Sequence, residues 1–223
     1  MTSIASAELL TTANPIGQGK WAVLGAGIRD SNLGDIGSDT TLTSYGAYLG
    51  YGITDALDAY LQIGTSTSTT FDVPNPAPPP ALLDCDITGT GWGANLKYTV
   101  LSEENMPVSL AIGAGYKSTS ITTKVSYGGT TIDKSTDTGT QMMIGVGVSK
   151  LIVPFIPYGA LAYRTDSADG NEVSTQLDLT VGSAIAWSTQ GAVFVEYTNQ
   201  SITPKGGDVY TSGQMALGVG YKI

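Results

Sequence analysis

Apolar and polar residues alternate with a period of two along most of this chain. The clearest case is the pair of segments 44–53 and 57–64, which flank the short polar turn Thr54–Ala56. Alternation on both sides of a tight turn predicts a β-hairpin. The same pattern recurs, and it predicts about ten strands, with eight and twelve as alternatives. We place them near residues 21–29, 44–53, 57–64, 91–100, 108–117, 141–149, 157–164, 176–187, 191–199 and 214–223.

The connections between these strands alternate between short and long. The short ones are 54–57, 101–107, 150–156 and 188–190, and the long ones are 30–39, 67–88, 118–138, 166–174 and 200–212. This arrangement, with both termini on the short-turn side, is typical of barrels with short periplasmic turns and long extracellular loops. We therefore predict an all-β fold: a single antiparallel up-and-down transmembrane β-barrel domain over residues 1–223, with 1–18 as a short N-terminal periplasmic segment. The Pro-rich run 74–80 is interpreted as a stiff brace inside one long loop.

The composition supports a membrane barrel. Charged residues make up 13% of the chain, against about 25% in a typical soluble domain. No run of about 18 apolar residues is present, so a spanning helix is not expected. Strands that alternate between lipid and a polar interior satisfy both observations.

Alternation alone does not say which row faces outward. The row opposite the apolar one is mostly Gly, Ser, Ala and Thr, which would solubilise the outside of a barrel poorly but fits a crowded interior. We therefore expect the apolar rows to face lipid. In the first strand we take Ala22, Leu24, Ala26 and Ile28 as this apolar row, with Arg29 opposite; the phase of 157–164 is left open. Aromatics on the apolar rows are expected to form membrane-interface girdles: Tyr45, Trp92, Tyr98, Tyr116, Trp187, Tyr197 and Tyr221.

Three stretches carry a family resemblance: 48–55, 112–116 and the terminal 217–223. With them the chain resembles, over essentially its full length, the small bacterial outer-membrane β-barrel proteins of the OmpA, OmpX and OmpW type within the porin-like superfamily. The resemblance implies assembly by the barrel-assembly machinery through the C-terminal strand, although that strand usually ends in an aromatic and here ends in Ile223. It implies little about function, because this family includes structural proteins, pores, adhesins and enzymes.

Little in the sequence suggests catalysis. The chain has no histidine, whereas the enzymatic barrels that it resembles rely on a histidine base. Serine and threonine nucleophiles would also need a base, and the acidic pairs in the loops are interpreted as solvated charges. Cys85 lies between Asp84 and Asp86, where a thiolate is disfavoured. We expect no enzyme activity, no cofactor and no metal.

The residues expected to line the lumen are Arg29, Asp58, Gln62, Asn95, Lys97, Lys117, Arg164, Asp178, Glu196 and Lys222. Because ten strands lie close to the size at which side chains fill the interior, two interpretations stay open. Either a narrow water-containing pore for ions or small solutes passes through, or these charges pair across the interior and plug it.

Other functional classes also stay open. The barrel could be a non-conducting structural or surface-recognition protein that acts through its acidic extracellular loops, or a route for small hydrophobic molecules. The expected partners are outer-membrane lipid and lipopolysaccharide; the formal net charge of −9 and the absence of a basic stripe argue against nucleic acid, and a monomer is favoured. Residues 1–8 lack the basic start and apolar core of a signal peptide, so we expect a mature chain in the bacterial outer membrane.

Overall fold

The computed structural model describes residues 12–31, 41–68, 71–75, 81–168 and 171–223. Eleven strands are present in this part of the chain: β1 (Trp21–Ser31), β2 (Thr41–Gly52), β3 (Leu57–Ser68), β4 (Phe71–Asn75), β5 (Ala81–Leu101), β6 (Ser109–Tyr127), β7 (Thr130–Ser149), β8 (Phe155–Ala168), β9 (Asn171–Ala186), β10 (Gly191–Pro204) and β11 (Tyr210–Lys222). None of the described residues forms a helix that is long and apolar enough to cross a membrane.

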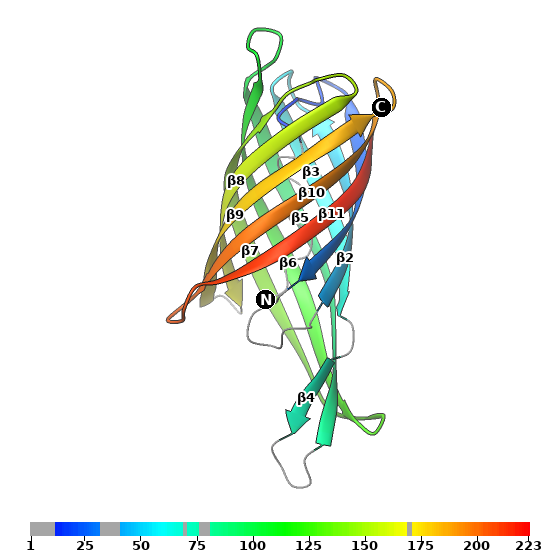
Figure 1. Ribbon diagram of the computed structural model, residues 1–223, viewed down its shortest axis with the longest axis vertical. Coiled ribbons are helices and arrows are strands. Elements are labelled where there is room, and N and C mark those ends of the chain that lie inside the picture. Colours follow the sequence, from blue (N-terminus) through cyan, green and yellow to red (C-terminus); the bar gives the residue numbers. More distant parts are fainter. Residues whose placement is uncertain (1–11, 32–40, 69–70, 76–80, 169–170) are drawn as a thin grey trace.

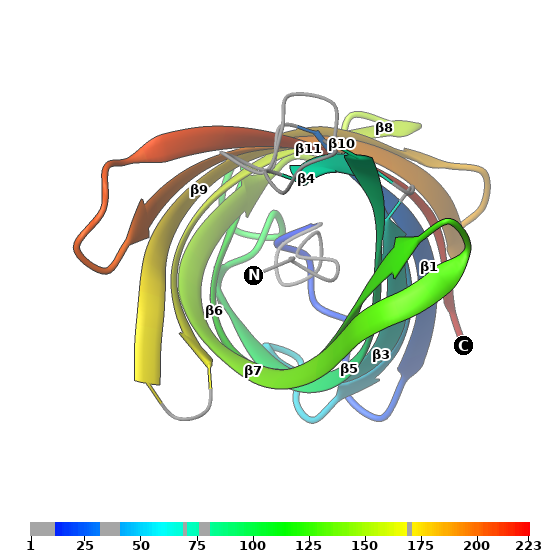
Figure 2. The same cartoon turned by 90° about the horizontal axis from the view of Figure 1, so that it is seen from below.

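Ten of the eleven described strands close into an antiparallel barrel. Each strand pairs with its neighbour in sequence, β1 pairs with β11, and β3 pairs with β5 to complete the ring. β4 lies outside the ring and pairs with β5 alone. The prediction of a single up-and-down barrel with about ten strands is confirmed (Figures 1 and 2).

The four connections β2–β3, β5–β6, β7–β8 and β9–β10 gather at one end of the barrel, beside Trp21 and Ile223. We call this end the short-turn mouth, and the opposite end the long-loop end. At the long-loop end β4 and the longest strands, β5 to β7, project well beyond the rest of the wall (Figure 1).

This projection corrects the loop prediction for 118–138. Strands β6 and β7 continue through that region as a paired hairpin that turns at Tyr127–Thr130, where Gly128 and Gly129 have φ of 55° and 79°. Residues with positive φ in a two-residue turn favour glycine, and such a turn matches the twist of the flanking strands. Similarly, part of the expected loop 67–88 forms β4 and the start of β5. Residues 76–80 of the Pro-rich run lie outside the described residues, and so do residues 32–39 of the expected loop 30–39.

The apolar rows face outward on every strand for which the sequence assigned a row, except β1. Leu61, Ile63 and Met142 are 61%, 67% and 62% exposed on the outer surface. In β8, whose phase was left open, Leu161 and Tyr163 face outward and Ala162 and Arg164 face inward.

The phase predicted for β1 is wrong. Ala22, Ala26 and Ile28 are buried inside, whereas Trp21 and Val23 are each 44% exposed. Both rows of this strand are apolar, so alternation did not distinguish them. The choice depends on packing inside the barrel, where Ala26 and Ile28 join Tyr48, Ala184, Phe194 and Ala216 in the hydrophobic cluster of the interior. The small alanines leave room for the two aromatic rings.

Candidate functional site in the barrel interior

Most of the polar residues predicted to line the lumen are buried in the structure. Eight of the ten have less than a tenth of their surface exposed: Asp58, Gln62, Asn95, Lys97, Lys117, Arg164, Asp178 and Glu196. They come from inward positions of β3, β5, β6, β8, β9 and β10. Lys222 is half-buried at the end of β11, where it lines a cavity at the short-turn mouth.

Arg29 is the exception, and its inward placement is wrong. Its side chain is exposed on the same outer row as Trp21 and Val23, because the whole of β1 has the opposite phase to that expected. The inward neighbour is Asp30, which is 1% exposed. Asp30 is absent from the predicted lumen residues because a one-residue error in the phase of a strand reverses the facing of every side chain.

At the short-turn mouth an ion pair joins two strands to the N-terminal segment. Lys97 Nζ lies 3.2 Å from Asp58 Oδ2, and both side chains are almost fully buried. Lys97 also donates to the carbonyl oxygens of Thr12 (3.2 Å) and Asn14 (2.9 Å). The Asp58 carboxylate accepts from the backbone N–H of Ile16 at 3.1 Å. Each charged group therefore binds its partner and the segment at once, as buried charges require.

Further contacts fix residues 12–16 inside the mouth (Figure 2). Thr99 Oγ1 donates to the Ala13 carbonyl oxygen at 2.9 Å, and the Ala13 N–H donates to Ser149 Oγ at 3.0 Å. Ala13 and Ile16 are 0% and 5% exposed. We refer to residues 12–17 as the mouth segment.

The sequence had assigned residues 1–18 to a periplasmic segment before the barrel. The mouth segment instead folds back into the barrel, and residues 1–11 lie outside the described residues. A stretch of six residues without alternation gives no pattern from which this docking could be predicted. The inward polar residues near the mouth were the available signal. Besides Asp58 and Lys97, these are Thr99, Ser149 and Ser109, whose Oγ donates to Asn14 Oδ1 at 2.5 Å.

Gly52 tests how closely the mouth segment is packed. A methyl group at this position would collide with the backbone carbonyl of Gly17, so Gly52→Ala is expected to displace the segment. Placing a cysteine at Ala13 in a Cys85→Ser background reports the displacement, and we expect maleimide labelling to accelerate about tenfold, which corresponds to about 1.4 kcal/mol of lost docking. Gly25→Ala is the matched control, because nothing lies within 4 Å of the added methyl. Equal labelling rates in the two variants would contradict the packing.

Nearer the long-loop end, a second layer of buried polar side chains lies on the inner face of the wall. Arg164 and Asp178 form an ion pair between β8 and β9, with 2% and 1% of their side chains exposed. Gln176 Nε2 donates to Asp178 Oδ1 at 2.6 Å, and Gln214 Nε2 donates to Asp30 Oδ1 at 2.6 Å. We call these five residues the Arg164 layer.

Other inward side chains lie between the mouth segment and the Arg164 layer. Tyr158 donates through its hydroxyl to Glu196 Oε2 at 3.1 Å. Asn95 Nδ2 donates to Gln62 Oε1 at 3.4 Å. A cavity of about 10 Å³ lies beside Gln62, Asn95 and Lys117, which is about the smallest space that holds one water molecule.

The aromatic residues predicted for the girdles lie on the outer wall. Tyr45, Trp92, Tyr98, Trp187, Tyr197 and Tyr221 are 45–60% exposed, and Tyr116 packs against Trp92 with ring centroids 5.9 Å apart. Trp92 and Tyr98 are six residues apart on β5, about 20 Å along the strand. Tyr98, Trp187 and Tyr221 lie near the short-turn mouth, so the aromatics fall at two levels, which remains consistent with two interfaces.

Cys85 lies on the projecting part of β5, where it is buried opposite Val125 of β6. Burial raises the pKa of its thiol above the ordinary value, and the Asp86 carboxylate raises it further. Since the thiolate is the nucleophile, we expect iodoacetamide at pH 8 to modify Cys85 at least tenfold more slowly than free cysteine. The rate should rise as the pH passes the raised pKa. Modification as fast as that of free cysteine at pH 8 would show that the thiol is activated.

The chemistry available to the interior is that of paired charges and amides. No group of three or more metal-ligating side chains occurs among the residues that the structure describes, and the chain has no histidine.

Comparisons with known proteins identify the fold. No protein-family model matches the sequence, and no curated protein matches it. The β domain of the Bordetella autotransporter BrkA matches with a TM-score of 0.58 at 12% identity, covering 93% of this chain and all of that one. The translocator domain of the autotransporter NalP from Neisseria meningitidis has a TM-score of 0.55 at 15% identity, covering 90% and 88%. The outer-membrane protease OmpT from Escherichia coli has a TM-score of 0.50 at 12% identity, covering 92% and 96%.

These neighbours include autotransporter domains and a protease, so what they share with this chain is architecture. The resemblance stated from the sequence is confirmed at that level. With its ring of ten antiparallel strands, its apolar outer wall and its polar interior, the chain has the fold of the bacterial outer-membrane β-barrels.

Proposed function

We propose that this chain is a non-enzymatic integral protein of the bacterial outer membrane whose lumen is closed by its own side chains. The observation that carries the proposal is the Arg164–Asp178 ion pair, which lies across two adjacent strands with both side chains almost fully buried. A charged pair that is kept from water inside a barrel occupies the path that ions would take. The barrel then acts as a structural or surface-recognition protein.

The mouth segment supports the proposal independently. It lies in the barrel at the short-turn mouth and is bound by the Asp58–Lys97 pair and by Thr99, Ser109 and Ser149. Closure therefore has two layers with different chemistry: a backbone segment at one end, and paired side chains nearer the other. Disrupting one layer leaves the other in place.

The recognition surface that we propose is the projecting hairpin of β6 and β7. Residues 130–138 of β7 are exposed on both faces, and β7 pairs with β8 only from Gly139 onward. This segment is therefore an edge that carries Asp133 and Asp137, together with Lys134. The hairpin also carries Lys124, so its two carboxylates and two lysines balance. We propose that this exposed polar edge binds a partner by strand pairing, or binds lipopolysaccharide through divalent cations held by its carboxylates.

We further propose that residues 12–223 form one barrel domain with no separate soluble unit, that assembly uses the terminal strand β11, and that the monomer is the working form. The outer wall would contact outer-membrane lipid. These proposals follow from the closure of β1 with β11, which leaves no open sheet edge within the ring for a second copy to pair with.

Planar-bilayer recording of the refolded protein tests the closed lumen. We expect no discrete current steps from the wild-type chain at either polarity, over voltages at which an open porin reconstituted in the same lipid conducts. Reproducible single-channel steps from the wild-type barrel would reject the proposal.

A narrow pore is the second candidate, and one observation favours it. Arg164 Nε and Nη1 and Asp30 Oδ2 are buried without a hydrogen-bond partner, and buried polar atoms normally bind water when protein groups are missing. Water in the Arg164 layer would provide a path for small ions. This alternative requires that the wild-type barrel conducts. It also requires that the current is lost when Arg164→Met together with Asp178→Leu makes the layer apolar.

A further inference from the structure

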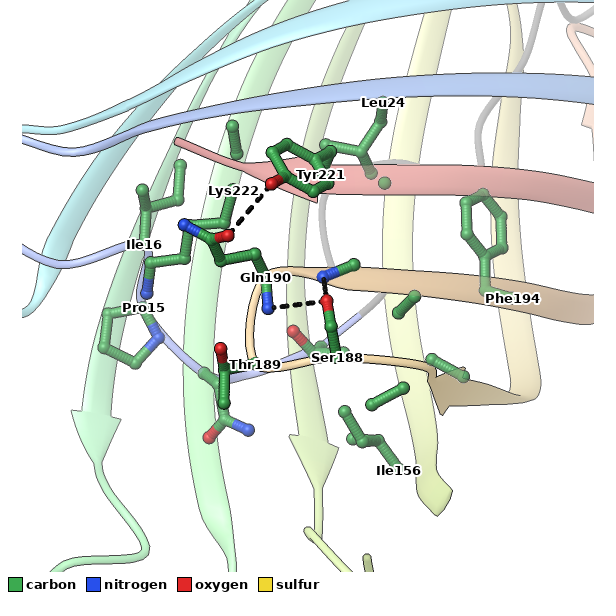
Figure 3. Close-up of a pocket in the computed structure, with 18 of the residues that line it drawn as sticks. Pro15, Ile16, Leu24, Ile156, Ser188, Thr189, Gln190, Phe194, Tyr221 and Lys222 are labelled. Atoms are coloured by element: carbon green, nitrogen blue, oxygen red, sulfur yellow. Dashed lines mark hydrogen bonds between the residues drawn. The ribbon is translucent and has the colours of Figure 1, made fainter. Parts of the chain in front are cut away.

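A cavity of about 270 Å³ opens at the short-turn mouth between the mouth segment and the barrel wall (Figure 3). Pro15 and Ile16 of the mouth segment form one side. Strands β1 and β8 to β11 and the turn from Ser188 to Gln190 form the other. This volume is just below the usual range for small-molecule sites, roughly 300–1,000 Å³. It is therefore sized for a small ligand.

The depth of this cavity is apolar. Leu24, Ile156 and Phe194 provide the large side chains, and the alanines at 22, 184 and 192 complete the lining. Phe194 and Ala184 belong to the buried cluster of the interior, and Leu24 and Ile156 pack against it. The site is thus a continuation of a rigid core, and it offers an alkyl chain contact without requiring side chains to rearrange.

The rim is cationic in a chain whose formal net charge is −9. Lys222 lines the cavity together with Lys97, and its ammonium group is repelled by Lys20 and Lys97 and attracted by Asp58. Asp58 is already paired with Lys97. Among the residues that the structure describes, no carboxylate lies within ion-pair distance of Lys222. Its charge is available to an incoming anion.

The other polar groups of the rim are largely bonded to one another. Ser188 Oγ accepts from the N–H groups of Gln190 (3.2 Å) and Gly191 (2.8 Å), and Tyr221 donates to Gln190 Oε1 at 2.9 Å (Figure 3). These bonds fix the shape of the β9–β10 turn. They leave Lys222 as the charged group that faces the opening.

We infer that this cavity binds a small single-chain anionic amphiphile, with its alkyl chain against Leu24, Ile156 and Phe194 and its carboxylate at Lys222. The apolar residues in the cavity favour an alkyl chain. The unpaired positive charge at the rim favours an anionic head group over a neutral or cationic one. This site depends on the docked mouth segment, which forms one of its sides, but it is independent of the Arg164 layer, because it opens at the mouth.

Decanoate is the probe, measured by equilibrium dialysis against the refolded protein held in amphipol, with protein-free amphipol as the blank. We expect saturable binding at one site, with affinity rising about fourfold for each methylene between hexanoate and decanoate. Lys222→Gln should weaken decanoate binding about fivefold, while Lys150→Gln, which removes an exposed lysine in the β7–β8 turn, should not. Decylamine should bind the wild type more weakly than decanoate does.

A second variant tests the apolar part of the cavity, where the alkyl chain would bind. Ala192→Phe places a ring in the cavity and should abolish decanoate binding, whereas Ala114→Phe adds the same ring to the outer wall and should leave it unchanged. Equal affinity for decanoate and decylamine, or a Lys222→Gln variant that binds like the wild type, would overturn the inference even if Ala192→Phe failed to fold. Binding that survives Ala192→Phe in a folded barrel would show adsorption to the apolar outer wall instead.

Discussion

Replacing Asp178 with alanine is expected to destabilise the folded barrel by about 3–5 kcal/mol. Arg164 is 1% exposed, its Nη2 atom pairs with Asp178, and its Nε and Nη1 atoms have no hydrogen-bond partner. The variant would leave a buried guanidinium without its counter-charge. Urea unfolding of the protein in lipid vesicles, followed by tryptophan fluorescence, measures the change.

The double variant Asp178→Ala with Arg164→Met is the decisive comparison. Removing both charges eliminates the uncompensated guanidinium, so most of the lost stability should return. Asp133→Ala, on the exposed face of the β6–β7 hairpin, should change stability by less than about 0.5 kcal/mol. If the single Asp178 variant lost less than 1 kcal/mol, water in the interior would be solvating Arg164, and the Arg164 layer would be more open than proposed.

Most of the wall of the barrel could be predicted because its physics is local. In most strands after β1, large apolar side chains alternate with small or polar ones, as Leu61 and Ile63 do with Gln62, and this period of two is visible in the sequence. Closure into a ring of ten followed from the alternation of short and long connections. Inward charges such as Lys97 and Glu196 could be predicted because they lie opposite a clearly apolar row, and a charge is costly on the face that contacts lipid.

The rest depends on contacts between residues far apart in the chain. Which row of β1 faces inward depends on packing against Phe194 and Tyr48, which lie on other strands. The apolar residues of β1 alone therefore do not predict it. Asp30 was missed for the same reason. The mouth segment is fixed by hydrogen bonds across 42 to 136 residues of sequence, which no local pattern records. The β6–β7 hairpin is predicted as a loop because most of its residues are threonines, serines and charges, and residues 130–138 of β7 are exposed on both faces.

The mouth segment leads to the second large expected effect. In the double variant Asp58→Ala with Lys97→Met, the segment loses the carboxylate that accepts from Ile16 and the ammonium that donates to Thr12 and Asn14. Hydrogen bonds to charged groups contribute about 1.5–3 kcal/mol each, so docking should weaken by at least about 3 kcal/mol. Maleimide labelling of a cysteine at Ala13, in a Cys85→Ser background, should then accelerate about a hundredfold.

The control is the charge-matched pair Asp133→Ala with Lys134→Met, which alters the exposed hairpin and should leave labelling at position 13 unchanged. The released barrel should still carry no current in a planar bilayer, because the Arg164 layer lies further along the same path and touches none of the substituted residues. If releasing the segment produced single-channel steps, the mouth segment would be the only barrier, and the Arg164 layer would have to contain a continuous file of water. Unchanged labelling would instead mean that Thr99, Ser109 and Ser149 hold the segment without the ion pair. Asp58 and Lys97 would then stabilise only the barrel wall.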